Sequence, residues 1–245
     1  AVLMPHTPLC CGYPLLAAGM GEAYRENRER NRAALAALLD EAESLGLRPA
    51  YCLTSCGTCR ESLEEHELKT LRPNLKHMDV TQFLMGRLDF PPAEDATPIL
   101  YHAACHAEWA DVPKTKAAGM YMKALEKITG RPVILSRHCC GESGTGAMTT
   151  PAIYNRLRDR KRETLAENLA EAPEAMPILA GCPSCKMGLT RILAEMRDKH
   201  VVSHTLEFLA EALDGPKWKK LLAKAAKAAR VPGARPRRAS APTCC

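Results

Sequence analysis

Two sets of cysteines share one order of spacing, and this pattern is where the sequence could do chemistry. Each set places a Cys-Cys-Gly triplet before a C-x-x-C motif. The first set holds Cys10, Cys11, Cys56 and Cys59, and the second holds Cys105, Cys139, Cys140, Cys182 and Cys185. Thiolates are soft ligands that favour zinc, copper(I) and iron–sulfur clusters, and C-x-x-C lets two sulfurs reach one site from a single turn. Because reducing compartments disfavour structural disulfides, the spacing indicates metal or redox chemistry.

The number of thiols in the second set separates the two leading metal hypotheses. A structural zinc site is a closed tetrahedron of four ligands, whereas the second set offers five cysteines that include an adjacent pair. A cluster several ångströms across can receive adjacent cysteines at different irons, and Gly12 and Gly141 allow the backbone to approach it closely. The residues therefore favour an iron–sulfur cluster, and a zinc-stabilised interaction scaffold stays open as the alternative.

The two sets belong to an internal duplication. The offset between equivalent positions is 129 residues for the paired cysteines, 126 for the C-x-x-C motifs and 125 for Phe83-Leu84 against Phe208-Leu209. A nearly constant offset indicates that one supersecondary unit is repeated. We therefore expect a first repeat over residues 1–96, a second over 97–215 and a basic, disordered tail over 216–245. The counterpart of Cys105 would lie upstream of Ala1, which predicts that this chain is the C-terminal portion of a longer polypeptide.

Short apolar runs alternate with helical patterns along both repeats, which predicts an α/β fold with parallel sheets flanked by helices. The expected strands cover 49–53, 99–101, 132–135 and 177–180, and the expected helices cover 22–45, 60–71, 114–129 and 154–169. Ligand sites in such folds gather at the carboxyl ends of the strands. We therefore expect the cysteine motifs to lie in loops at that edge.

Composition and charge narrow the class of protein. Of 245 residues, 46% are hydrophobic and only 4% aromatic, which favours a helix-rich core. The chain contains no stretch of about 18 uninterrupted apolar residues that would predict a membrane span. No leader is visible before Cys10, although a segment upstream of Ala1 could carry one, and we expect a cytoplasmic protein. Much of the net charge of +6 lies in the tail, which favours a solvated extension over nucleic-acid binding. Peripheral association with the inner face of the membrane stays open.

The sequence around the cysteines resembles that of a known family. Four segments are similar to signatures of the cysteine-rich CCG-domain family: CCGYPLLAAGM, YHAACHAEW, CCGESGTGAM and GCPSCKMGL. This family includes the CCG-type subunit of heterodisulfide reductase, the iron–sulfur subunits of glycolate oxidase and anaerobic glycerol-3-phosphate dehydrogenase, and lactate-utilisation proteins. Its pattern is one cysteine, Cys-Cys-Gly and C-x-x-C, which the second set satisfies in full.

The resemblance implies an iron–sulfur electron-transfer module of an oxidoreductase, with a non-cubane 4Fe-4S cluster at the second set. A cluster at the first set stays open because its leading cysteine is absent. By resemblance, FAD on an upstream domain or partner flavoprotein of the lactate or glycolate type sends electrons through ferredoxin-like clusters to this module. A quinone, a disulfide or another acceptor would then receive them. The alternative is a disulfide reductase site of the heterodisulfide reductase kind, and the residues identify neither the acceptor nor a catalytic group.

Three other residues near the motifs have two interpretations each. His102 and His106 flank Cys105, so each is expected either to support the cofactor through a hydrogen bond to sulfur or a proton relay, or to structure its loop. Cys52 either contributes a thiolate or packs within its strand. The terminal Cys244 and Cys245 lack a partner motif and are left outside the site.

Overall fold

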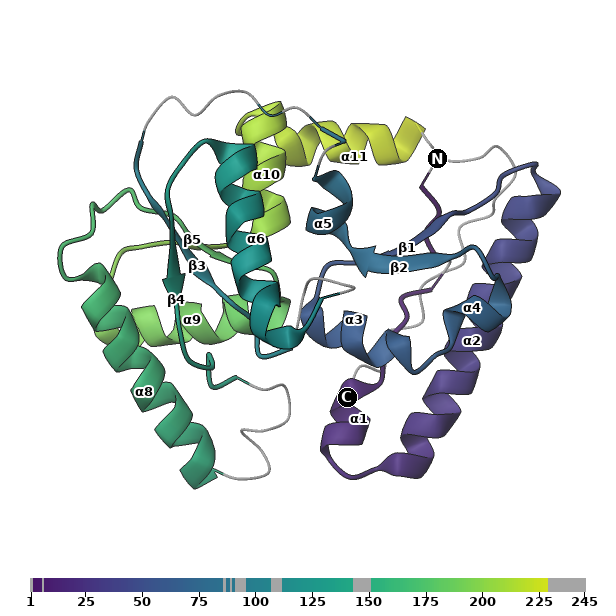
Figure 1. The fold of residues 1–245 in the computed structure, drawn as a ribbon, viewed down its shortest axis with the longest axis horizontal. Helices are drawn as coiled ribbons and strands as arrows, with labels where there is room; N and C mark the ends of the chain where they lie inside the picture. The colour runs from purple at the N-terminus through teal and green to yellow at the C-terminus, as the bar shows by residue number, and fades with distance from the viewer. Residues whose placement is uncertain are drawn as a thin grey trace.

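The chain folds around two separate parallel β-sheets, each flanked by helices (Figure 1). The structure is a computed structural model that describes residues 2–5, 7–85, 87–88, 90, 96–106, 112–142 and 151–228. The predicted α/β class with parallel strands is confirmed.

The second sheet has four strands in the order β4-β3-β5-β6, all parallel. Its strands are β3 (Ile99–His102), β4 (Val133–Ser136), β5 (Ile178–Ala180) and β6 (Val202–His204), and its helices are α6 (Lys114–Thr129), α8 (Pro151–Leu169) and α9 (Pro183–Met196). Successive side chains of a strand point to opposite faces, so Leu100 and Ile178 pack with the α8 and α9 side chains, whereas Tyr101 and Leu179 pack with those of α6. The sheet is therefore buried on both faces, as expected for parallel strands.

The first sheet is smaller and pairs only β1 (Tyr51–Thr54) with β2 (Lys76–Asp79). The surrounding helices are α1 (Tyr13–Ala17), α2 (Gly21–Ser44), α3 (Gly57–Glu64), α4 (Leu68–Leu71) and α5 (Val80–Leu84). Leu39 of α2 packs with Leu68 and Leu75 to form the core of this half.

The two halves of the chain share an order of elements. The order β1, α3, β2 and α5 is matched by β5, α9, β6 and α10 (Thr205–Asp214), except that the short α4 lies between α3 and β2. In both runs the helix that carries C-x-x-C has the first cysteine of the motif as its N-cap. Asp79 caps α5 and His204 caps α10 through their side chains. The sequence patterns missed β2 and β6, because both strands are short and carry polar residues.

Two predicted segments differ in the structure. The helix expected over 60–71 is interrupted between α3 and α4, where Glu67 adopts a left-handed φ of 50°. Part of the tail expected to be disordered is helical, as α11 (Trp218–Ala228), because its alanines, lysines and leucines are strong helix formers. Residues 229–245 of that tail lie outside the described residues. No helix that the structure describes has the length and apolar character needed to cross a membrane.

Candidate metal centre

The cysteine loops lie at the carboxyl ends of parallel strands, as predicted. Cys105 follows β3, Cys139 and Cys140 follow β4, Cys182 follows β5 and Cys56 follows β1. Both C-x-x-C motifs open a helix, whose positive dipole end favours a thiolate. Neighbouring thiols and burial outweigh this effect at Cys59, Cys182 and Cys185, whose pKa values are raised.

The five cysteines of the second set form a continuous group of sulfurs. The Sγ atoms of Cys105 and Cys139 are 3.2 Å apart, and those of Cys140 and Cys185 are 3.6 Å apart. Hydrogen bonds also join the thiols of Cys139 and Cys140 and those of Cys182 and Cys185. The structure thus brings together all five residues that the sequence selected.

The first set is gathered in the same way but less completely. The thiols of Cys11 and Cys56 each form a hydrogen bond with that of Cys59. Cys10 is exposed, and its carbonyl oxygen accepts hydrogen bonds from Asn27 and Asn31 of α2, at 3.0 and 2.7 Å.

Cys52 lies apart from this group, because it packs against the Leu39, Leu68 and Leu75 core. Burial alone raises the pKa of its thiol to about 11. This environment supports the packing interpretation of Cys52 over the ligand interpretation.

The two sets meet at the boundary between the two halves of the chain. The Sγ atoms of Cys56 and Cys182 are 3.6 Å apart, which links the two C-x-x-C motifs. Close by, the Nε2 atom of His204 donates to the carbonyl oxygen of Ser55 at 2.9 Å. Thiol contacts therefore run without a break from Cys11 in the first half to Cys105 in the second.

In each set one thiol has the most strongly lowered pKa, and in the first set the pKa of Cys11 is lowered as well, to about 7. Hydrogen bonds with Cys105 and then Cys140 lower the pKa of Cys139, and hydrogen bonds with Cys182 and then Cys59 lower the pKa of Cys56. Metal binding requires deprotonated sulfur, so both positions are suited to ligation.

His102 is buried beside the second set. Its side chain is completely inaccessible to solvent, and one of its ring nitrogens and the Sγ atoms of Cys140 and Cys185 all lie within 4.8 Å of one another. In the described part of the chain neither ring nitrogen forms a hydrogen bond of good geometry, although the backbone of Ser136 lies close enough to raise the pKa of the ring slightly. Burial and the nearby charge of Lys161 lower its pKa to about 3, which keeps the imidazole neutral. An unsatisfied buried imidazole is costly, so its position fits a group that the thiols would hold.

His106 has a different environment. Its Nδ1 atom is 2.6 Å from Oε2 of Glu61 on α3, and its ring packs edge-to-face on Tyr13 with centroids 4.7 Å apart. These contacts join the second half to the first, which supports the loop-structuring interpretation of this histidine.

Lys161 of α8 is a buried cation that the sequence analysis missed. Its Nζ atom donates to Oγ of Ser136 and to the carbonyl oxygen of Arg137, both at 2.7 Å, at the end of β4 that leads to Cys139. The side chain is completely buried, and within the described residues no carboxylate pairs with it. Burial lowers its pKa to about 8, and the second-set thiols act in the opposite direction. The sequence signal was weak because five basic residues crowd residues 156–162.

Backbone geometry requires glycine at positions 12 and 141. Both have left-handed φ angles, +81° and +71°. A Cβ atom on Gly12 would lie 2.5 Å from Nδ2 of Asn27, and one on Gly141 would lie 3.0 Å from the backbone nitrogen of Arg158. Each glycine therefore lets its Cys-Cys pair turn directly against a helix.

We expect Gly141→Ala to destabilise the fold by about 2 kcal/mol or more, because it adds a steric clash with α8 to the cost of a left-handed alanine. Gly130→Ala is the matched control, since Gly130 has φ +65° but open space around its Cα atom. Urea unfolding of the two variants measures the difference. Equal losses of stability would contradict the close approach to α8.

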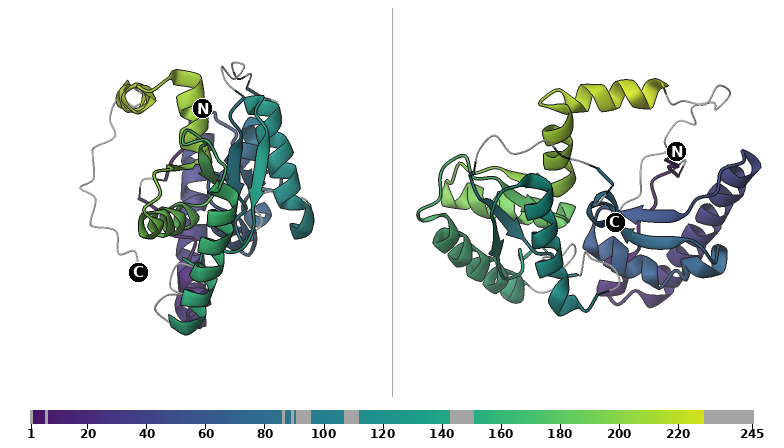
Figure 2. Two further views of the ribbon diagram at one scale, coloured as in Figure 1. Left: turned by 90° about the vertical axis from the view of Figure 1, so that its left-hand side faces the viewer. Right: turned by 45° about the horizontal axis from the view of Figure 1, so that its top comes forward.

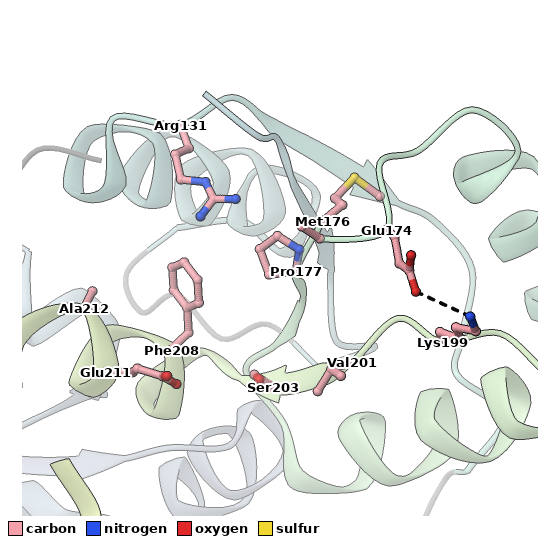
Figure 3. A pocket seen from close by; sticks show the side chains of 11 residues that line it. Arg131, Glu174, Met176, Pro177, Lys199, Val201, Ser203, Phe208, Glu211 and Ala212 are labelled. Carbon is pink, nitrogen blue, oxygen red and sulfur yellow. Dashed lines mark ion pairs between the residues drawn. The ribbon is translucent and has the colours of Figure 1, made fainter. Parts of the chain in front are cut away.

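A surface hollow of about 470 Å³ lies at the other edge of the second sheet (Figure 3). Met176, Pro177 and Val201, which precede β5 and β6, line it together with Phe208 of α10. Its lining contains no cysteine, and the strands separate it from the thiols. The hollow is therefore not part of the candidate metal centre.

The curated relatives that this chain matches in sequence are named as an iron–sulfur protein and as oxidoreductase subunits. The family model for a cysteine-rich domain, CCG, matches residues 99–190. An uncharacterized iron-sulfur protein of Methanococcus maripaludis is 21% identical over 202 residues, which cover 82% of this chain and 37% of the relative. One subunit of the fumarate reductase (CoM/CoB) of Methanothermobacter marburgensis is 23% identical over 188 residues, covering 75% of this chain and 34% of the relative.

A third relative is one of the subunits of anaerobic glycerol-3-phosphate dehydrogenase from Escherichia coli K12, which is 24% identical over 223 residues. The match covers 83% of this chain and 49% of the relative. The chain thus spans about a third to a half of the length of these curated relatives.

Proposed function

Since residues 99–190 belong to the cysteine-rich CCG-domain family, we propose that the second cysteine set binds an iron–sulfur cluster and that the chain transfers electrons within an oxidoreductase. The observation that carries this proposal is the contact among five thiols at the carboxyl edge of one sheet. We propose Cys105, Cys139, Cys140, Cys182 and Cys185 as the ligands of a 4Fe-4S cluster.

The residues around the sulfurs support a cluster over zinc. A closed zinc site takes four ligands, and here a fifth thiol and a neutral imidazole adjoin the same group. A bound iron–sulfur cluster supplies a centre that accepts and releases single electrons. Buried Lys161 would offset the negative charge of its thiolates, and His102 would donate a hydrogen bond to sulfur.

The first set extends this proposal. Cys10, Cys11, Cys56 and Cys59 lie in the equivalent loops of the first half and could hold a second cluster. The 3.6 Å contact between Cys56 and Cys182 supports a short path for electrons between the two halves.

We propose that the electron donor is a flavoprotein domain or subunit of a dehydrogenase. The similarity to one subunit of anaerobic glycerol-3-phosphate dehydrogenase and to one of a fumarate reductase supports a role beside a separate catalytic subunit. In its specific form, this proposal assigns the electron donor to a flavoprotein of the lactate or glycolate dehydrogenase type.

Metal analysis of anaerobically purified chain tests the proposal. We expect about four iron and four acid-labile sulfide per chain for one cluster, or twice that for two, with a paramagnetic signal in one redox state. Stoichiometric zinc without sulfide would reject the electron-transfer function and favour the interaction scaffold.

A further inference from the structure

Helix α11 is a surface feature that the metal centre does not explain. None of its residues is buried, and Leu221 and Leu222 are 48% and 60% exposed. In the left view of Figure 2, which looks along α11, the helix stands beside the rest of the described chain. An amphipathic helix of a globular domain normally buries its apolar stripe. Among the described residues only Trp218 of this stripe is partly covered, and both leucines lack an apolar partner.

The two faces of α11 are cleanly divided. At 100° per residue, Trp218, Leu221, Leu222 and Ala225 fall on one side. The opposite side carries Lys219, Lys220, Lys224 and Lys227. The Nζ atom of Lys219 lies 5.3 Å from the centre of the Trp218 ring, at the border between the faces.

The charged side chains of α11 and of the residues around it, 216–245, are all positive. Residues 216–245 contain nine lysines and arginines and no aspartate or glutamate. Within the described ranges no carboxylate forms an ion pair with a lysine of α11. A binding partner of α11 that complements these lysines would therefore present a continuous negatively charged surface.

The apolar stripe identifies which anionic surface fits. Nucleic acid would use the lysines but leave the tryptophan and both leucines in water. A bilayer of anionic lipids offers negative headgroups directly above a hydrocarbon layer, and a helix with basic and apolar faces lies in that interface. Eleven residues span only about 16 Å, roughly half of the hydrocarbon core, so this helix lies on a membrane rather than crossing it.

We propose that α11 is an interfacial anchor that binds the protein to an anionic membrane surface. Trp218, Leu221 and Leu222 enter the boundary between headgroups and acyl chains, and the lysines pair with anionic headgroups. This inference concerns a segment outside the metal centre and holds whichever metal the cysteines bind.

Flotation of the full chain with lipid vesicles tests the anchor. The chain should float with phosphatidylcholine vesicles that contain phosphatidylglycerol, remain behind with pure phosphatidylcholine, and be released as salt is raised, because screening weakens the headgroup contacts. The double variant Leu221→Ser and Leu222→Ser keeps every basic residue and should lose most of the bound fraction, at least about fivefold.

A charge variant and a folding control complete the design. Replacing Lys219, Lys220 and Lys224 with glutamine removes three of the nine basic residues and should weaken the preference for phosphatidylglycerol. Because both leucines are exposed, the double serine variant should unfold at the same urea concentration as the wild type. Equal flotation of the wild type and the serine variant would overturn the proposal in favour of simple charge attraction, and failure of the wild type to float would also overturn it.

Discussion

Replacing Cys185 with alanine is expected to remove the iron and sulfide held by the second cysteine set. Its buried thiol contacts that of Cys140 at 3.6 Å, forms a hydrogen bond with Cys182 and lies within 4.8 Å of a His102 nitrogen. We expect a loss of about four iron per chain, measured by iron and sulfide analysis after anaerobic purification. Any iron that remains would then belong to the first set.

Cys52→Ala provides the matched control for this loss. Cys52 lies in β1 and packs against apolar side chains of other elements, so its replacement should keep the full iron content. The small cavity that it creates should lower the free energy of unfolding by about 1 kcal/mol. The proposed ligand set would be wrong if Cys185→Ala kept its iron while Cys52→Ala lost it.

The chemistry of the site was predictable because it depends on spacing along the chain. Parallel strands deliver their loops to one edge, so Cys105, Cys139 and Cys182 had to come together once the strands were placed. The equivalence of the two C-x-x-C motifs followed from the duplication, and both motifs open a helix as their repeat requires.

The contact between Cys56 and Cys182 was not predictable in the same way. It joins residues 126 positions apart and depends on how the two halves pack, with Thr81 bonded to Tyr121 and Ser55 to His204 across the boundary. Sequence periodicity describes elements but carries no information about such packing. The helix α11 was missed for a related reason, because a basic, alanine-rich composition is shared by solvated tails and interfacial helices.

Lys161 shows most clearly what local pattern cannot reveal. It is one of several basic residues in α8, and only the three-dimensional fold distinguishes it as the one directed inward, toward Ser136 and Arg137. An ammonium group buried without a carboxylate is unfavourable unless another negative charge faces it. The second-set cysteines act on Lys161 as such a charge, because their charges raise the pKa of its ammonium group.

Lys161→Met is therefore expected to leave the iron content unchanged and to lower the midpoint potential of the second-set cluster. Removing a nearby positive charge disfavours the reduced form, which carries one more electron. Two unit charges separated by about 8 Å interact by about 2 kcal/mol at an effective dielectric constant of about 20. This energy corresponds to a shift of roughly 90 mV toward negative potential for one electron, which a redox titration followed by paramagnetic resonance would measure.

Lys186→Met separates this effect from a general loss of charge. Lys186 directly follows the C-x-x-C motif of the second set, but its ammonium group pairs with Glu207 and is partly exposed to water. The carboxylate and the solvent already screen its field, so the potential should move much less than in Lys161→Met. Equal shifts in the two variants, or an unchanged potential in a fully loaded Lys161→Met protein, would show that the buried ammonium does not set the potential of the cluster.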